Sequence, residues 1–167
     1  MITSSDLKIY LSGGSGNTTP SASLGGAIST TEVVDNALQN LFPNVTSAQA
    51  LAGITQYLCI YIKNTHATLT WTAPYTWISS NTPSTDSTIN ISVATETGSP
   101  VQTISDLTTA PTGQSFTAPT SFATGLSLGD LVPGACKAVW VQRVISPSAV
   151  AYSNDTATLN YQGDTLA

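Results

Sequence analysis

Charged side chains are scarce in this chain. They make up 8% of its 167 residues, whereas they make up about 25% of an average soluble domain. The basic residues are Lys8, Lys63, Lys137 and Arg143, and the one histidine is His66. Enzymes that move protons or phosphoryl groups generally bring several such side chains together, and here they are spread almost singly. The composition therefore favours binding or assembly over catalysis, and we predict a protein that is not an enzyme and has no catalytic residues.

The absence of basic clusters also excludes two kinds of partner. The formal net charge is −5 and the isoelectric point is about 4.3. Binding to nucleic acid requires clustered Lys and Arg that displace counterions from the phosphates, and attraction to an anionic membrane requires similar clusters. We therefore expect neither nucleic acid nor a membrane as a partner.

Metal-binding and disulfide patterns are missing as well. One histidine and the two distant cysteines, Cys59 and Cys136, do not have the spacing of a zinc site, and no stretch alternates carboxylates as a calcium loop does. We predict no metal and no cofactor. We expect two buried free thiols in place of a disulfide. The N-terminus lacks the basic start and apolar stretch of a secretory signal, which predicts synthesis in the cytoplasm.

What the chain does contain is a series of short β-patterns. At 17.2 kDa it is long enough for one core. Apolar residues alternate with small polar ones, or form dense runs of β-formers, and turns rich in Pro, Asn, Ser and Gly separate these segments. The segments are residues 7–11, 57–63, 69–72, 75–78, 88–93, 137–144 and 157–161. This pattern predicts an all-β fold with a single β-sandwich, either jelly-roll or immunoglobulin-like, because both have similar short strands.

The first part of the chain differs from the rest in composition. Residues 12–26 consist mostly of Gly, Ser, Thr, Asn and Pro, which predicts either a flexible arm, mobile or ordered by a partner, or a surface loop. Residues 29–32 read Ser-Thr-Thr-Glu, the spacing of a capping box, and Val34, Leu38 and Leu41 follow at helical spacing. They predict one short helix, and residues 47–52 favour a further helical turn. We expect an N-terminal strand and arm in residues 1–28 and a sandwich domain in residues 29–167.

One catalytic motif occurs in the sequence. Residues 125–129 read Gly-Leu-Ser-Leu-Gly, which matches the G-x-S-x-G nucleophile elbow of hydrolases. That motif needs a strand before it, a helix after it and a histidine later in the chain, whereas His66 lies upstream. We interpret the motif as a chance match.

Three tryptophans, Trp71, Trp77 and Trp140, lie within the β-patterns. Flat aromatic faces beside Asn and Thr side chains are suited to stacking sugar rings. Aromatic residues at alternating strand positions more often fill a core or a subunit interface, where each buries about 150–250 Å². We therefore take the three tryptophans as core residues or as a candidate aromatic interface.

Two stretches within the first 65 residues resemble a group of tailed-bacteriophage virion proteins. The first runs from Ser5 to Gly14 and continues through residues 20–29, Pro-Ser-Ala-Ser-Leu-Gly-Gly-Ala-Ile-Ser. The second joins Asn-Leu-Phe at residues 40–42 to Gln-Tyr-Leu-Cys-Ile-Tyr-Ile-Lys-Asn at residues 56–64. The remainder is similar mainly in its Thr-rich strands and in Asn154-Asp155 before a terminal strand.

Small all-β proteins of this group include decoration, or cement, proteins of the capsid. The resemblance implies a non-enzymatic structural protein on the exterior of the virion capsid, which clamps neighbouring subunits of its partner, the major capsid protein. The scarcity of charge is consistent with such a role, because a clamp buries neutral surface and avoids unpaired charge at the centre of its interface.

The flexible arm is the segment from which we expect contact with the capsid or with a neighbouring subunit, since ordering it would enlarge the contact area. The expected contact residues are Ser12, Gly13, Gly14, Ser15, Gly16, Asn17, Ser23, Leu24, Gly25, Gly26 and Ile28. We also expect a homo-oligomer, a dimer or trimer. Two other interpretations remain open: a tail, baseplate or fibre module, and a carbohydrate-binding adhesin domain.

Overall fold

The computed structural model describes residues 1–166, and their regular structure is mostly β. The strands form three sheets, and every pair of neighbouring strands within them is antiparallel. The prediction of an all-β class is confirmed. None of the helices in residues 1–166 has the length and apolar character needed to cross a membrane.

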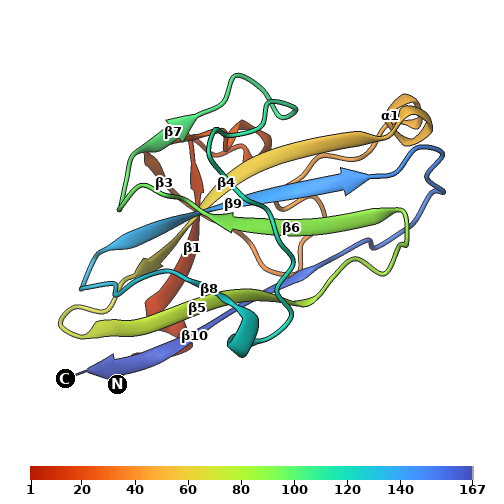
Figure 1. The fold of residues 1–167 in the computed structure, drawn as a ribbon. Coiled ribbons are helices and arrows are strands. Elements are labelled where there is room, and N and C mark those ends of the chain that lie inside the picture. The colour runs from red at the N-terminus through yellow and green to blue at the C-terminus, as the bar shows by residue number, and fades with distance from the viewer. Residues whose placement is uncertain (167) are drawn as a thin grey trace.

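The largest sheet has five strands in the order β3-β1-β4-β9-β6 (Figure 1). They are β1 (Leu7–Ser12), β3 (Ile28–Glu32), β4 (Ile54–Asn64), β6 (Ser87–Val93) and β9 (Cys136–Ile145). The central pair, β4 and β9, is in register from Ile54 opposite Ile145 to Lys63 opposite Cys136. Residues 58–62 of β4 are all buried, as the continuous apolar sequence of this strand predicts for a strand covered on both faces.

Two smaller sheets and four short helical segments complete the fold. The three-stranded sheet has the order β10-β5-β8, and β2 pairs with β7 in the two-stranded sheet. The strands are β2 (Gly25–Gly26), β5 (Thr70–Ser80), β7 (Val101–Thr103), β8 (Leu126–Ser127) and β10 (Thr158–Leu166). The helical segments are α1 (Ser47–Ala52) and the 3-10 turns η1 (Ser4–Asp6), η2 (Pro20–Ala22) and η3 (Phe122–Thr124).

Two buried clusters lie on opposite faces of the five-stranded sheet, because successive residues of a strand point to opposite faces. Ile60 and Val139, from β4 and β9, join Trp71 and Ile78 of β5 in the first cluster, so this cluster lies between the five- and three-stranded sheets. Trp140, the next residue of β9, joins the second cluster with residues of β4 and β7. The five-stranded sheet is therefore covered by other parts of the chain on both faces.

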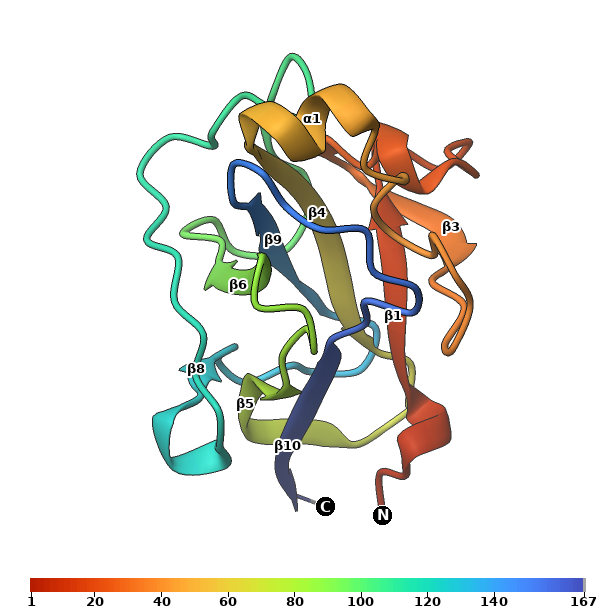
Figure 2. The same cartoon turned by 90° about the vertical axis from the view of Figure 1, so that its right-hand side faces the viewer.

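The start of the chain and the end of β10 lie close together at one end of the molecule, and α1 lies at the opposite end (Figures 1 and 2). The turn that joins β4 to β5 is also distant from α1, because α1 precedes the first residue of β4 and the turn follows its last. The long strands therefore separate an end that holds the termini from an end that holds α1.

The helix predicted to follow residue 29 is not formed, so this expectation was wrong. Residues 28–32 form β3 and pair with β1, and residues 33–46 contain no helix. Asn36 and Gln39 have φ of 57° and 58°, a conformation that ends a right-handed helix. The helix begins after Thr46, whose Oγ1 accepts a hydrogen bond from the Gln49 backbone N–H at 3.3 Å.

The flexible arm is also corrected, because residues 12–28 are fastened to the domain by hydrogen bonds. The buried Ser23 carbonyl accepts from the Cys59 backbone N–H at 2.8 Å. The buried Ser12 hydroxyl accepts from the Gly25 backbone N–H at 3.0 Å. Asn17 Nδ2 donates to the Ser12 carbonyl at 2.6 Å. The small residues let the backbone approach the sheet closely, so the polar composition reflects close packing of the main chain.

Candidate contact surfaces

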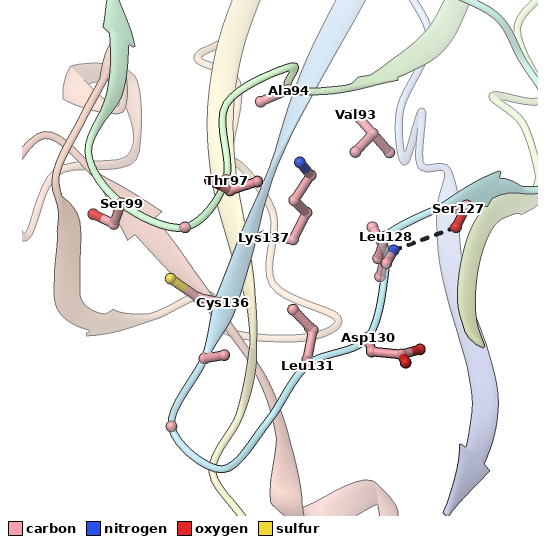
Figure 3. Close-up of a pocket in the computed structure, with 14 residues that line it drawn as sticks. Val93, Ala94, Thr97, Ser99, Ser127, Leu128, Asp130, Leu131, Cys136 and Lys137 are labelled. Carbon is pink, nitrogen blue, oxygen red and sulfur yellow. Dashed lines mark hydrogen bonds between the residues drawn. The ribbon is translucent and has the colours of Figure 1, made fainter. Parts of the chain in front are cut away.

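A depression of about 780 Å³ lies between the segment after β6 and the connection from β8 to β9. Figure 3 shows the side chains of the neighbouring residues Cys136 and Lys137 pointing in different directions, with Ser127 and Asp130 on the far side of the depression. Among residues 1–166 there is also no group of three or more His, Cys, Asp or Glu side chains that could hold a metal ion. The residues that line the depression come from the segment after β6, from the connection between β8 and β9, and from the start of β9.

Lys137 and Ser127 already make hydrogen bonds within the chain. Lys137 Nζ donates to the Glu96 carbonyl at 2.7 Å, and burial lowers the pKa of Lys137. The Ser127 hydroxyl accepts from the Gly129 backbone N–H at 3.3 Å. Burial raises the pKa of the Cys136 thiol, which disfavours the reactive thiolate. This arrangement favours structure over acid–base or nucleophilic chemistry.

The G-x-S-x-G motif does not form a nucleophile elbow. The 3-10 turn η3 precedes it, β8 contains its serine, and no helix occurs in residues 128–135. His66 does not act as a partner of Ser127, since its Nδ1 accepts from the backbone N–H groups of Thr68 and Leu69 at 3.1 and 3.0 Å. The motif is therefore part of an edge strand and the loop that follows it.

The two cysteines are free. Cys59 is buried opposite Trp140 in the middle of the β4–β9 pair, whereas Cys136 is half-buried opposite Lys63 at one end of this pair. Burial raises the pKa of the Cys59 thiol. The expectation that both thiols are free is confirmed. The expectation that both are buried is confirmed for Cys59, whereas Cys136 is only half-buried.

Two of the three tryptophans are core residues and do not contribute to a surface. Trp71 is 2% exposed and packs edge-on against Tyr161 with 5.8 Å between ring centroids. Trp140 is 0% exposed, in the second buried cluster. The candidate aromatic interface was therefore wrong for these two. Trp77 is half-buried and remains a candidate.

Trp77 belongs to a patch that we call the aromatic face, formed by Tyr75, Trp77, Phe122, Asn160 and Gln162. Tyr75 and Trp77 alternate on β5 with the buried Thr76 and Ile78, so they point outward. Phe122 lies against both rings, with centroids 5.2 and 6.0 Å away, and is 43% exposed. Gln162 and Asn160 of β10, both exposed, pair with Tyr75 and Trp77. The aromatic face thus places three rings beside two amide groups.

A second exposed apolar patch, the helix-end surface, consists of Leu51 and Val150. Their side chains are 71% and 76% exposed. The Ser148 backbone N–H donates to the Leu51 carbonyl at 3.1 Å, and that of Ala149 donates to the Ala50 carbonyl at 3.0 Å. These bonds hold α1 beside the loop after β9, at the end of the molecule opposite the termini (Figure 2).

The residues expected to contact a capsid do not form one exposed surface. These eleven residues fall into three groups by burial. Ser12, Ser23 and Gly25 are buried; Gly14, Asn17, Leu24, Gly26 and Ile28 are half-buried; and Gly13, Ser15 and Gly16 are exposed. The exposed members form the tip of the turn after β1.

The sequence alone did not indicate Phe122, Gln162, Leu51 or Val150. Tyr-Thr-Trp at residues 75–77 carried a signal, because it placed two aromatic residues on one face of a strand. The other members come from separate elements that meet only in the fold. Compared with protein-family models, with curated proteins and with solved structures, the chain gave no match.

Proposed function

We propose that this protein is a non-enzymatic structural protein of a tailed-bacteriophage virion, which decorates the capsid exterior and clamps neighbouring subunits of the major capsid protein. The resemblance within the first 65 residues suggests this class. The structural observation that supports it is the helix-end surface, where Leu51 and Val150 are largely exposed on two segments that backbone hydrogen bonds hold together.

The helix-end surface is suited to contact with a neutral partner surface. Burying one such side chain contributes about 1.5–3 kcal/mol. The Asp86 carboxylate accepts a hydrogen bond from the Val150 backbone N–H at 3.0 Å. A partner would therefore bury apolar side chains here while the acidic group keeps its bond to the main chain.

We also infer that the five- and three-stranded sheets are the two layers of a single β-sandwich. The first buried cluster supports this, since it combines Ile60 and Val139 of the larger sheet with Trp71 and Ile78 of the smaller. A sandwich suits a clamp because it supports its contact residues on a rigid core. Light scattering tests the proposed dimer or trimer, which would have two or three times the mass of the 17.2 kDa chain.

Cosedimentation with capsids tests the proposed function. The probes are tailless mature capsids and dissociated capsid subunits from the phage whose virions contain the chain, as found by mass spectrometry. We expect saturable binding to capsids and none to free subunits. The double variant L51S/V150S should bind at least about tenfold more weakly, while V132S, which replaces another exposed apolar residue (56%), should bind as the natural chain does.

Two results would contradict this proposal. Recovery of the chain with tails and not with capsids would assign it to a tail, baseplate or fibre. Capsid binding that L51S/V150S leaves unchanged would show that the helix-end surface is not the contact.

The aromatic face supports a second candidate function, carbohydrate binding. Rings of Tyr75, Trp77 and Phe122 offer flat apolar faces, and the exposed amides of Asn160 and Gln162 can bond hydroxyl groups. Tryptophan fluorescence titrated with neutral mono- and oligosaccharides tests it. Because Trp71 and Trp140 are buried, the response reports on Trp77. A saturable change that is lost in F122S, which keeps this reporter, would support the function, and no change with any sugar would contradict it.

A further inference from the structure

The turn between β4 and β5 depends on an unprotonated nitrogen of the chain's single histidine. His66 Nδ1 accepts two backbone hydrogen bonds, from Thr68 N–H at 3.1 Å and from Leu69 N–H at 3.0 Å. A ring nitrogen accepts a hydrogen bond only while it carries no proton. Protonation of Nδ1 would therefore remove both bonds together.

Asn64 extends this arrangement into the neighbouring loop. Its side chain is fully buried, and its Oδ1 accepts the His66 backbone N–H at 3.0 Å. Its Nδ2 donates to the carbonyls of Leu69 and Leu131 at 2.8 and 2.9 Å. Leu131 lines the depression described above. The same amide thus joins the His66 turn to the wall of that depression.

Several charged groups lie on the elements around this turn. They are the N-terminal amine, Asp6 on η1, Lys8 on β1, Lys63 on β4, Asp130 before Leu131, and Asp164 on β10, which pairs with Thr72 of β5. Among these residues, Asp6 is bonded directly to the turn, because its backbone carbonyl accepts a hydrogen bond from the Thr65 backbone N–H at 2.7 Å.

Asp6 carries a negative charge near this turn. Hydrogen bonds from the Thr3 backbone and hydroxyl, with a smaller contribution from His66 itself, hold the pKa of Asp6 below its usual value. Asp6 is therefore negatively charged throughout the range of about pH 5–8 in which histidine side chains change charge. An imidazole that is unprotonated at Nδ1 accepts both hydrogen bonds of the turn, whereas an imidazolium carries a proton on each ring nitrogen and loses both.

We propose that His66 is a pH-sensitive latch, which holds the β4–β5 turn closed while Nδ1 of its imidazole is unprotonated and releases this turn when Nδ1 is protonated. The latch does not depend on the proposed virion function, because it follows from hydrogen bonds within the chain.

NMR-detected hydrogen exchange tests the latch. We expect the protection factors of the Thr68 and Leu69 amides to fall at least about tenfold from pH 8 to pH 5 in the natural chain. The matched variant is H66N, because an asparagine Oδ1 accepts the same backbone hydrogen bonds in an Asx turn and does not titrate. Its protection factors should stay within about twofold over this range.

Three results would overturn the proposal: constant protection in the natural chain, an equal fall in H66N, or a ring nitrogen spectrum that shows Nδ1 protonated at pH 8. A further measurement needs no variant, so it remains decisive if H66N does not fold. The ring carbon–proton signals of His66 should titrate with the same midpoint as the Thr68 and Leu69 amides, and different midpoints would exclude the latch.

Discussion

Residues 12–28 and residues 33–45 show opposite relations between composition and burial. The first segment is polar and glycine-rich, yet Ser12, Ser23 and Gly25 are buried and hydrogen-bonded. The second contains apolar residues at helical spacing, yet Val34 and Leu38 are 65% and 70% exposed. Small residues can bury main chain against a sheet, and apolar residues without a complementary surface remain outside. Side-chain hydropathy alone therefore does not decide which segment belongs to the core.

The largest expected effect concerns Gly25 in the first segment. A Cβ at this position would lie 2.0 Å from the Gln102 carbonyl oxygen and 2.9 Å from Trp140, and φ is +88°. We expect G25V to destabilise the fold by about 3 kcal/mol or more, measured by chemical denaturation. The control is G14A, which has a similar φ of +94° but nothing within 4 Å of its Cβ, and should cost about 1 kcal/mol. Equal effects would show that close packing at Gly25 is unimportant.

Arg143 fastens the second segment. It donates to the Pro43 carbonyl at 2.8 Å and to the buried Gln56 Oε1, and it lies 4.7 Å from the centroid of the Phe42 ring. We expect R143M to cost about 2–3 kcal/mol, because Gln56 loses a charged donor, and to make residues 33–45 sensitive to limited proteolysis. Unchanged proteolysis would show that other contacts hold this segment.

The matched control for Arg143 is K8M. Lys8 forms the exposed ion pair with Glu32 at 3.0 Å, and its loss should change the free energy of unfolding by less than about 1 kcal/mol.

Tyr61 holds the C-terminal end of the first segment, residues 12–28, through Gly26. Its hydroxyl donates to the Gly26 carbonyl and accepts from the Val101 backbone N–H at 3.2 Å. We expect Y61F to cost about 2 kcal/mol at pH 7, because two backbone groups lose their partner. Chemical denaturation measures this loss, and a value near zero would show that water replaces the hydroxyl.

Alkaline pH tests the same contact. Burial raises the pKa of Tyr61 to about 12, above its ordinary value near 10. The neutral phenol is therefore favoured in the folded state, so its contribution is fully present below about pH 10 and is lost as pH rises through 12. The denaturation midpoint should fall over this range, and less steeply in Y61F. Identical slopes would assign the fall to other groups, such as the buried Cys59.

The smallest expected effect concerns the exposed residues of the second segment. L38S should change the free energy of unfolding by less than about 0.5 kcal/mol. L41S should cost about 1–2 kcal/mol, because Leu41 packs against the first buried cluster. Thermal unfolding compares the two, and a large loss in L38S would contradict its exposure.

Local sequence patterns were sufficient for the long strands and insufficient for contacts between distant segments. Strands β4 and β9 were predicted because their dense β-formers match a sheet covered on both faces. Residues 29–32 have the sequence spacing of a capping box, but they pair with β1 as strand β3, whereas Thr46 caps α1. Local sequence does not reveal that strand pairing. The same holds for the aromatic face, since Phe122 meets Trp77 through η3 and Gln162 meets Tyr75 through strand pairing.

The way this chain holds its few charges has a consequence for its response to salt. Within residues 1–166 one salt bridge occurs, the exposed pair of Lys8 and Glu32, and Arg143 is bound by neutral oxygens. Dissolved ions screen attraction between charges and leave such neutral contacts largely unaffected. The folded chain should thus tolerate a wide range of ionic strength with little change in stability, and any partner that binds the helix-end surface should remain bound in concentrated salt.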